Sequence, residues 1–251
     1  MKIVIFLVLS VILTFASEYR YRKYDHVKNF IEPLIKPTIK LGLKYDVPPA
    51  AILAIACIES GYGRGYVASI SGNILSLGTN KGEKELPALF LPNIKDPYKI
   101  IYNSSEIARY QKNELRYIKR AKSLKKDYRP LAYAGTSKKL QYFDNHPKEK
   151  LKANLECIED FCKIWISSNN KYKPFKKSRR DLDIRVKIDG KLVLFQKVTI
   201  KEFIYNISGK KNSFNYRKTW AKKVISVMNN IGLVELTQDI KNGKHLNDIW
   251  K

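Results

Sequence analysis

Beyond the N-terminus, the longest apolar stretch lies within residues 47–61, which read Val-Pro-Pro-Ala-Ala-Ile-Leu-Ala-Ile-Ala-Cys-Ile-Glu-Ser-Gly. Two prolines at its start suit the first turn of a helix, where a backbone N–H has no intrahelical partner to lose. From residue 50 to residue 58, no side chain is more polar than that of Cys57. A helix that is apolar on every face is buried on every face. The segment therefore predicts a central helix that ends near Gly61, a residue suited to a left-handed cap.

Glu59 follows this apolar run directly, at the C-terminal end of the predicted helix. Ile55 and Ala56 lie one turn earlier, so the carboxyl group is expected to be partly removed from water. Desolvation and the negative end of the helix dipole both disfavour the charged form and raise the pKa of Glu59. General acid catalysis near neutral pH requires an acid of this kind. The pattern alone fits equally well a glutamate at the solvated end of a structural helix.

Hydrophobic spacing predicts the other elements. Further helices are expected over residues 30–43, with local breaks at two prolines, 99–126, as a basic amphipathic helix, 148–166, 198–205 and 219–231. Residues 61–97 hold half of the twelve glycines, which predicts irregular backbone and short strands. Ile184, Val186 and Ile188 alternate with polar residues before Asp189-Gly190, which predicts a β-hairpin over residues 184–199. The expected fold class is mainly α, an α+β fold with a small β-containing lobe.

The N-terminus has the pattern of a secretory signal. Lys2 precedes a short apolar run, which ends with the small residues Thr14 and Ala16. The run is shorter than the roughly 20 residues that a membrane-spanning helix needs. We therefore expect cleavage after Ala16, export to the periplasm, cell envelope or exterior, and contact with the membrane only through this signal. An uncleaved N-terminal anchor is the alternative.

The chain carries 48 Lys and Arg against 23 Asp and Glu, a net charge of +25. This excess favours an anionic partner. Because export is expected and no groove-reading motif is present, nucleic acid is not expected as a partner. Anionic polymers of a cell wall are the expected partners instead. The equally plain alternative is a lysine-rich solvated surface. The three histidines are far apart and no H-E-x-x-H, C-x-x-C or phosphate-binding loop occurs, so neither a metal nor an organic cofactor is expected.

Residues 55–68, Ile-Ala-Cys-Ile-Glu-Ser-Gly-Tyr-Gly-Arg-Gly-Tyr-Val-Ala, resemble the catalytic segment of the bacterial endo-β-N-acetylglucosaminidases. These are peptidoglycan hydrolases of lysozyme-like fold, including flagellar and Bax-like members. Residues 71–78 are similar to the family's Asn-Asn-Leu-Phe-Gly-Ile stretch, with Leu75 in place of Phe and Ser76 in place of Gly. Weaker similarities occur at residues 142–144, 158–161 and 214–224. The resemblance covers roughly residues 30–232, and residues 47–68 carry the specific part.

The resemblance implies a lysozyme-like catalytic domain, here over residues 30–236, after a basic segment at 17–29 and before a polar tail at 237–251. It implies cleavage of the bond after N-acetylglucosamine in peptidoglycan glycan strands, with Glu59 as general acid. A second carboxylate from the small lobe is expected to assist. Glu85 is preferred because an apolar run follows it, and Glu83 is second; otherwise the acetamido group of the substrate does this work. The residues expected to bind substrate are Tyr62, Tyr66, Asn73 and Tyr216.

Two other functions remain open at this point. A lytic transglycosylase would share the helix and the single glutamate but would leave an anhydro-sugar end. A non-catalytic wall-binding protein would keep the fold without the chemistry. The Gly-Tyr-Gly that follows Glu59-Ser60 favours the glucosaminidase.

Overall fold

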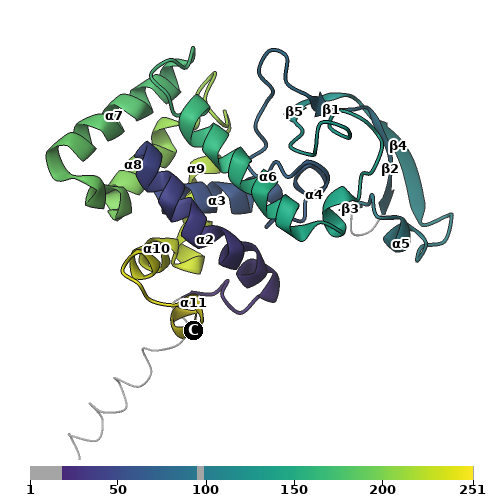
Figure 1. Ribbon diagram of the computed structural model, residues 1–251, viewed down its shortest axis with the longest axis horizontal. Helices are drawn as coiled ribbons and strands as arrows, with labels where there is room; N and C mark the ends of the chain where they lie inside the picture. The colour runs from purple at the N-terminus through teal and green to yellow at the C-terminus, as the bar shows by residue number, and fades with distance from the viewer. Residues whose placement is uncertain (1–18, 95–98, 251) are drawn as a thin grey trace, which may run out of the picture.

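The computed structural model describes residues 19–94 and 99–250, which form a helical body and a smaller β lobe (Figure 1). The predicted signal segment, residues 1–16, lies outside the described residues. The helical body contains α2 (Asp25–Tyr45), α3 (Pro49–Ser60), α6 (Pro147–Asp160), the π-helical turn η2 (Phe161–Trp165), α7 (Lys173–Asp189), η3 (Lys191–Phe195), α8 (Lys197–Asn206), α9 (Trp220–Ile231), α10 (Leu233–Lys241) and α11 (Leu246–Ile249). The β lobe and its connections contain α4 (Tyr66–Ser71), β1 (Glu85–Leu86), β2 (Leu89–Ile94), β3 (Lys99–Ile100), α5 (Ser104–Ile107), β4 (Leu115–Arg120), β5 (Ser123–Lys126) and η1 (Tyr142–Asp144).

Helix α3 is the central helix that the sequence predicts. Residues 50–57 are each at most 1% exposed, and the helix packs against α2, α8, α9 and α10. Gly61 ends it in the left-handed conformation, with φ 55° and ψ 49°, and its N–H donates to the carbonyl of Cys57. An all-apolar surface thus places the end of α3, and with it Glu59, next to the protein core. The mainly α fold class is confirmed.

Helix α2 runs unbroken through Pro33 and Pro37, so the predicted local breaks are absent. The helix buries a continuous face that includes Ile31, Leu34 and Ile35. This packing against α3 and α6 compensates for the backbone hydrogen bonds that the two prolines cannot make.

The β lobe contains one three-stranded antiparallel sheet, in the order β3-β2-β4, and a short β1-β5 pair. Leu91 lies opposite Ile118 in the β2–β4 register. A small apolar core lies beneath, formed by Ile70, Leu86, Leu89 and Leu91. The lobe therefore has a core of its own, separate from that of the helical body.

The prediction of a helix over residues 99–126 is wrong, because this segment forms β3, α5, β4 and β5. Its apolar residues are too sparse to define a helical stripe. The apolar strand β2 instead requires a partner, and β4 pairs with it along six residues. Phe90 is the one exposed residue of β2, and its ring stacks on that of Tyr117 with centroids 5.3 Å apart.

The predicted hairpin over residues 184–199 is also wrong. Residues 173–189 form α7, and η3 and α8 follow. The buried residues Phe175 and Leu182 set a helical period, whereas Ile184 and Ile188 of the apparent alternation are 51% and 74% exposed. Gly190 has φ 71° and ψ 179°, so Asp189-Gly190 ends a helix instead of turning a hairpin.

Both ends of the described chain pack together on the helical body. The predicted domain limit at residue 236 falls within α10, and Ile240 and Leu246 beyond it are buried. Arg22 donates to the carbonyl of Ile231, and Trp250 Nε1 donates to the carbonyl of Arg22 at 3.0 Å. Within the described ranges, no helix is both long and apolar enough to cross a membrane.

Candidate active site

The carboxyl group of Glu59 lies where the last turn of α3 meets the start of α9. Trp220 Nε1 donates a hydrogen bond to Glu59 Oε1 at 2.7 Å. The Asn215 side chain also hydrogen-bonds the carboxyl group, and the cations of Lys125 and Arg217 act on it. Two segments that are distant in sequence from α3, namely β5 and residues 215–220 at the start of α9, therefore converge on one acid.

Burial is the largest influence on Glu59, and it raises the pKa of the carboxyl group. The Trp220 hydrogen bond, Lys125, Asn215 and Arg217 each favour the charged form and oppose this shift. Burial prevails, so the pKa remains above its ordinary value. This is the direction expected from the apolar helix, and it suits a residue that donates a proton.

The residues after Glu59 form a turn that depends on their identity. Ser60 Oγ donates to the carbonyl of Ala56 and accepts from the N–H of Gly63 at 2.7 Å. Gly63 has φ 74°, and a Cβ there would lie 2.9 Å from the Phe30 ring. The Glu-Ser-Gly-Tyr-Gly sequence thus builds a tight turn that holds the end of α3 in place.

Lys125 is a neighbour of Glu59 that the sequence interpretation missed. Residue 125 forms a bridge with Gly78, and its ammonium donates to the carbonyl of Ser76. Ser76 has φ 51°, the left-handed conformation that favours glycine. Burial lowers the pKa of Lys125, and the Glu59 carboxylate acts in the opposite direction. No local pattern marks this lysine among the many others; only the antiparallel fold of the lobe brings it to the acid.

Asn73, predicted to bind substrate, is buried, and its amide group bonds to the backbone of the β lobe. The residue is 1% exposed. Its Oδ1 accepts from the N–H of Leu77, and its Nδ2 donates to the carbonyls of Leu77 and Lys126, each at 2.8–2.9 Å. Asn73 therefore fixes residues 73–77 against the end of β5, which is a structural role.

Glu83 and Glu85 lie in the β lobe beside β5, and each is paired with a lysine. Lys126 Nζ lies 2.5 Å from Glu83 and 2.6 Å from Asp160, so it joins the two carboxylates. Burial alone would raise the pKa of Glu83, but hydrogen bonds from Asn80 and Lys126 hold it below its ordinary value. Glu85 pairs with Lys122 at 2.7 Å, and its buried Oε2 has no hydrogen-bond partner. Glu83 is thus engaged, whereas Glu85 keeps one unused oxygen.

The aromatic residues predicted to bind substrate lie in different surroundings. Tyr62 has φ 57°, contacts the rings of His26 and Phe30, and lines a pocket of about 570 Å³ beside α2 and α6. Tyr66 packs against the small core of the β lobe. Tyr216 is 71% exposed between two neighbours of Glu59, Asn215 and Arg217. Of the three tyrosines, Tyr216 is therefore the one that is largely open to solvent and whose neighbours in sequence act on the acid.

Phe214 is part of an aromatic row beside Trp220. Its ring centroid lies 5.5 Å from that of Trp220, 6.1 Å from that of Trp165 and 5.6 Å from that of Phe161. The row supports the indole that holds Glu59, so Phe214 acts through packing.

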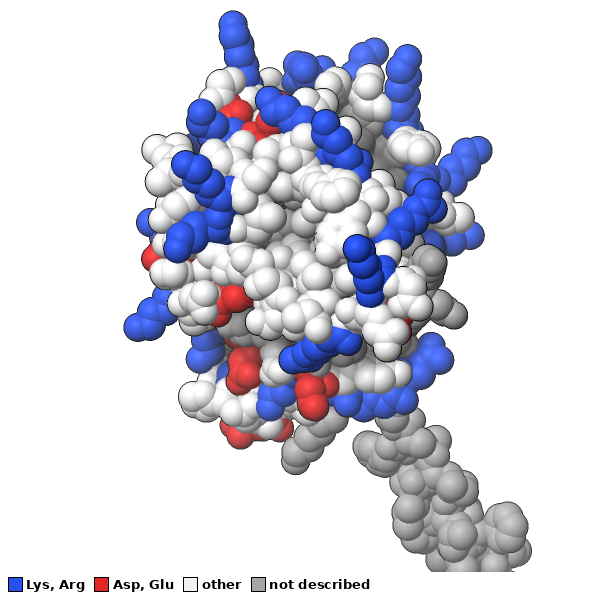
Figure 2. Space-filling view, turned by 90° about the vertical axis from the view of Figure 1, so that its right-hand side faces the viewer, with Lys and Arg blue, Asp and Glu red and all other residues white. Residues whose placement is uncertain are grey.

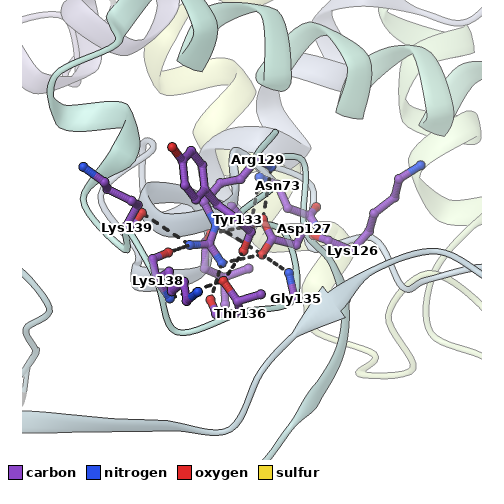
Figure 3. A network of polar contacts seen from close by, with 11 residues as sticks. Asn73, Lys126, Asp127, Arg129, Tyr133, Gly135, Thr136, Lys138 and Lys139 are labelled. Carbon is purple, nitrogen blue, oxygen red and sulfur yellow. Dashed lines mark hydrogen bonds and ion pairs between the residues drawn. The ribbon is translucent and has the colours of Figure 1, made fainter. Parts of the chain in front are cut away.

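A second polar network orders the loop after β5 (Figure 3). Asp127 and Arg129 form an ion pair with fully buried side chains, 2.6 Å apart. Arg129 also donates to the carbonyls of Thr136, Lys138 and Lys139, and Asp127 accepts from the N–H of Gly135. The pair thus binds the loop 130–139 to the β lobe.

Basic side chains project around the face of the molecule that the β lobe presents, and acidic ones are fewer there (Figure 2). This agrees with the overall excess of positive charge. Within residues 19–94 and 99–250, no group of three or more His, Cys, Asp or Glu side chains is arranged to hold a metal ion. The three cysteines, Cys57, Cys157 and Cys162, are buried free thiols.

Comparison with known proteins gives one structural similarity. No protein-family model matches the chain, and no curated protein matches its sequence. Among solved structures, the catalytic domain of the autolysin Auto from Listeria monocytogenes is similar, with a TM-score of 0.46 and 15% sequence identity. The match covers 90% of this chain and 93% of that chain. At this level of similarity, function has to be inferred from Glu59 and its neighbours.

Proposed function

We propose that the protein is an exported glycoside hydrolase that cleaves the N-acetylglucosaminyl bond of bacterial peptidoglycan, with Glu59 as general acid. The observation that carries the proposal is a carboxyl group with a raised pKa, held by Trp220 at the end of a buried helix. The resemblance of residues 55–68 to the glucosaminidase segment supplies the substrate class.

Glu59 donates its proton to the leaving glycosidic oxygen as the bond breaks. The carboxylate left behind is stabilised by the Trp220 N–H, by the Asn215 side chain and by the charges of Lys125 and Arg217. These groups favour the product of proton transfer, whereas burial favours the acid that begins it. The site can therefore both hold a proton and release it.

Glu85 is the preferred second carboxylate. Its buried Oε2 has no hydrogen-bond partner in the described structure, whereas both oxygens of Glu83 are bound by Asn80 and Lys126. A second carboxyl group acts about 5–5.5 Å from the acid in a retaining enzyme and about 6.5–9.5 Å in an inverting one. Glu85→Gln is expected to lower kcat far more than Glu83→Gln. Full activity in both variants would leave the second task to the substrate's acetamido group.

The lytic transglycosylase is the second candidate, because Glu83 and Glu85 are both paired with lysines. Of these three carboxylates, Glu59 is then the one without a lysine partner, so no second carboxylate is free to activate water. A transglycosylase needs no activated water, because its substrate attacks itself. The hydrolase and the transglycosylase leave different sugar ends, so the chemical structure of the released fragments decides between them.

Mass analysis of the fragments released from purified peptidoglycan tests the proposal. Hydrolysis gives reducing N-acetylglucosamine ends, a transglycosylase gives anhydro-muramic ends, and a binding protein leaves the sacculi intact. Glu59→Gln keeps the shape of the side chain and removes the donated proton, so the rate is expected to fall by about 10²–10⁴-fold. A folded Glu59→Gln protein with the original rate would show that Glu59 is not the acid.

The positive charge supports a further part of the proposal, attachment to anionic wall polymers. Attraction between exposed charges is screened beyond about 8 Å at physiological ionic strength. Binding of Glu59→Gln to isolated sacculi is therefore expected to weaken as salt is added. Binding that does not change with salt would mean that charge is not its cause.

A further inference from the structure

Exposed aliphatic side chains gather where α7, η3 and α8 follow one another, over residues 173–202, which we call the α7–α8 corner. Seven large aliphatic side chains are exposed in the part of the chain that the structure describes, and four of them lie here. These four form the aliphatic cluster, and each is more than half exposed: Ile184, Ile188, Leu192 and Val198. Single exposed apolar residues are ordinary on a protein surface, whereas a group of them marks an interaction site.

Helix α7 presents a side to solvent that is both apolar and basic. Leu182 faces the core, so Ile184 and Ile188, which are one turn apart, lie on the outer side of the helix. Arg180 and Lys187 are exposed and lie one turn before and one turn after Ile184, on the same side. Helices that lie on a membrane surface combine the same two kinds of residue.

The other half of the aliphatic cluster lies beside the end of α7. Leu192, in η3, follows the last residue of α7 by three positions. Arg185 of α7 donates to Thr199 Oγ1 at 3.4 Å and pairs with Glu202, which holds the start of α8, and with it Val198, against α7. These elements form the end of the molecule opposite the β lobe (Figure 1).

The α7–α8 corner has a large excess of positive charge. It contains ten Lys and Arg against four Asp and Glu. Three of the acids are already paired, Asp181 with Lys177, Asp183 with Arg179 and Glu202 with Arg185, and Lys191 pairs with Asp46 of another segment. In the described structure the remaining acid of the corner, Asp189, forms no ion pair, and neither do six cations: Lys173, Lys176, Arg180, Lys187, Lys197 and Lys201.

An anionic bilayer is the partner that fits both properties. Its phosphates attract Lys and Arg, and the boundary between headgroups and acyl chains accepts aliphatic side chains. A glycan or another soluble polyanion offers no hydrocarbon to the aliphatic cluster. A second copy of the chain, packed through the same corner, would bring two surfaces of like charge together.

We propose that the α7–α8 corner is a membrane-contact surface, which lies on an anionic phospholipid bilayer with the aliphatic cluster in the headgroup boundary and the unpaired cations on the phosphates. The helix lies along the surface and does not cross it. The inference does not depend on the proposed hydrolysis. It adds a membrane contact within the folded body of the protein, where the sequence predicts contact only through the N-terminal signal.

A fluorescent label at the aliphatic cluster tests this in the full chain. The three native thiols are buried, so a new surface cysteine, Ile188→Cys, takes an environment-sensitive dye selectively. The probes are vesicles of phosphatidylcholine with anionic phosphatidylglycerol, and vesicles of phosphatidylcholine alone. The dye emission is expected to shift to shorter wavelength on the anionic vesicles. Leu131→Cys, at an exposed side chain of the loop 130–139, is the matched control and is expected to show no shift.

Three results of the labelling experiment would overturn the inference. The first is no shift at position 188, and the second is an equal shift at both positions. The third is emission at short wavelength from position 188 before vesicles are added, because the cluster would then be covered by the chain itself or by a second copy.

Two changes in the labelled Ile188→Cys protein separate charge from apolar contact. Arg180→Gln with Lys187→Gln is expected to reduce the preference for anionic over neutral vesicles about fivefold for each charge removed. Leu192→Asp is expected to require about tenfold more lipid for the same shift, because one aliphatic side chain no longer leaves water. Lys119→Gln removes a cation from the exposed side of β4 and is expected to leave both quantities unchanged.

The control variants decide what the vesicles recognise. A loss of preference in Lys119→Gln equal to that for each charge in α7 would mean that net charge binds the lipid, and the inference would be wrong. A Leu192→Asp protein that binds as before would show contact with phosphates alone, which would also overturn it. Release of peptidoglycan fragments is measured separately and depends on Glu59, which lies outside the α7–α8 corner, so either proposal can fail while the other stands.

Discussion

The indole Nε1 of Trp220 donates to Glu59 Oε1 at 2.7 Å, although the two residues are 161 positions apart. Trp220 is the first residue of α9 and is 4% exposed, so its ring is fixed by the core of the helical body. Its N–H therefore sets both the orientation of the acid and part of its proton affinity. A substitution of Trp220 can therefore change the pKa of Glu59 while Glu59 itself is kept.

Trp220→Phe is expected to raise the pKa of Glu59 further, because a donor that favours the charged form is lost. If Glu59 is active when protonated, the alkaline limb of the kcat profile moves to higher pH. Trp250→Phe is the matched control, since Trp250 Nε1 donates to a backbone carbonyl of Arg22 instead. The two profiles are measured on the same peptidoglycan. An unmoved alkaline limb in Trp220→Phe would show that this hydrogen bond does not tune the acid.

Lys125→Met is expected to move the alkaline limb in the same direction, because removal of a cation makes the carboxylate less favourable. Methionine retains most of the aliphatic length, so packing beside β5 changes little. Lys119→Met on the exposed side of β4 removes the same charge from another position in the lobe. A shift of equal size in both variants would mean that net charge, and not the position of Lys125, is responsible.

Glu59→Gln is expected to raise stability at neutral pH. The folded-state pKa of Glu59 lies above its ordinary value, so the folded state binds the proton more tightly than the unfolded chain does. Stability from this group is complete below the unfolded pKa and is lost as pH rises through the folded pKa. Glutamine resembles the protonated acid and has no such loss. Thermal unfolding of both proteins is compared at acidic and neutral pH.

The expected gain in Tm appears at neutral pH and fades at acidic pH. A gain of equal size at both values would indicate a packing effect. A loss at neutral pH would contradict the raised pKa itself.

Asp127→Asn is expected to lower the free energy of unfolding by about 3–5 kcal/mol, because Arg129 stays buried and loses its counter-charge. Asp183→Asn is the matched control. Its ion pair with Arg179 is 60% exposed on the aspartate side, so a change of at most about 1 kcal/mol is expected. Urea unfolding measures both. Equal losses would mean that the network of Figure 3 is no stronger than an ordinary surface pair.

The sequence predicts the central helix and its acid well, for a local reason. Every side chain from residue 50 to residue 58 is apolar or small, so burial of α3 and desolvation of Glu59 follow from neighbours within two turns. Trp220 and Lys125 are different, because they reach Glu59 only after distant elements have packed. A single sequence contains no pattern that predicts the contacts of Trp220 and Lys125 with Glu59.

The two wrong secondary-structure predictions have a related cause. Ile184, Val186 and Ile188 alternate as a strand would, yet the buried Phe175 and Leu182 decide that the segment is a helix. Leu115 and Ile118 are spaced as on a helix, yet β2 recruits them as its partner strand. In both places the deciding contact lies outside the window in which the pattern is read. The tertiary environment then overrides local periodicity.

The separate cores of the two lobes bear on how the protein opens. The β lobe is held by a cluster of four buried apolar residues, whereas the helical body shares one continuous core. Regions with few buried apolar contacts open at lower free energy than the global unfolding. The amides of the β2–β4 ladder therefore exchange with solvent through openings that leave α3 protected. Glu59 therefore lies on the part of the molecule with the higher free energy of opening, whereas Lys125, which acts on it, lies on the part that opens first.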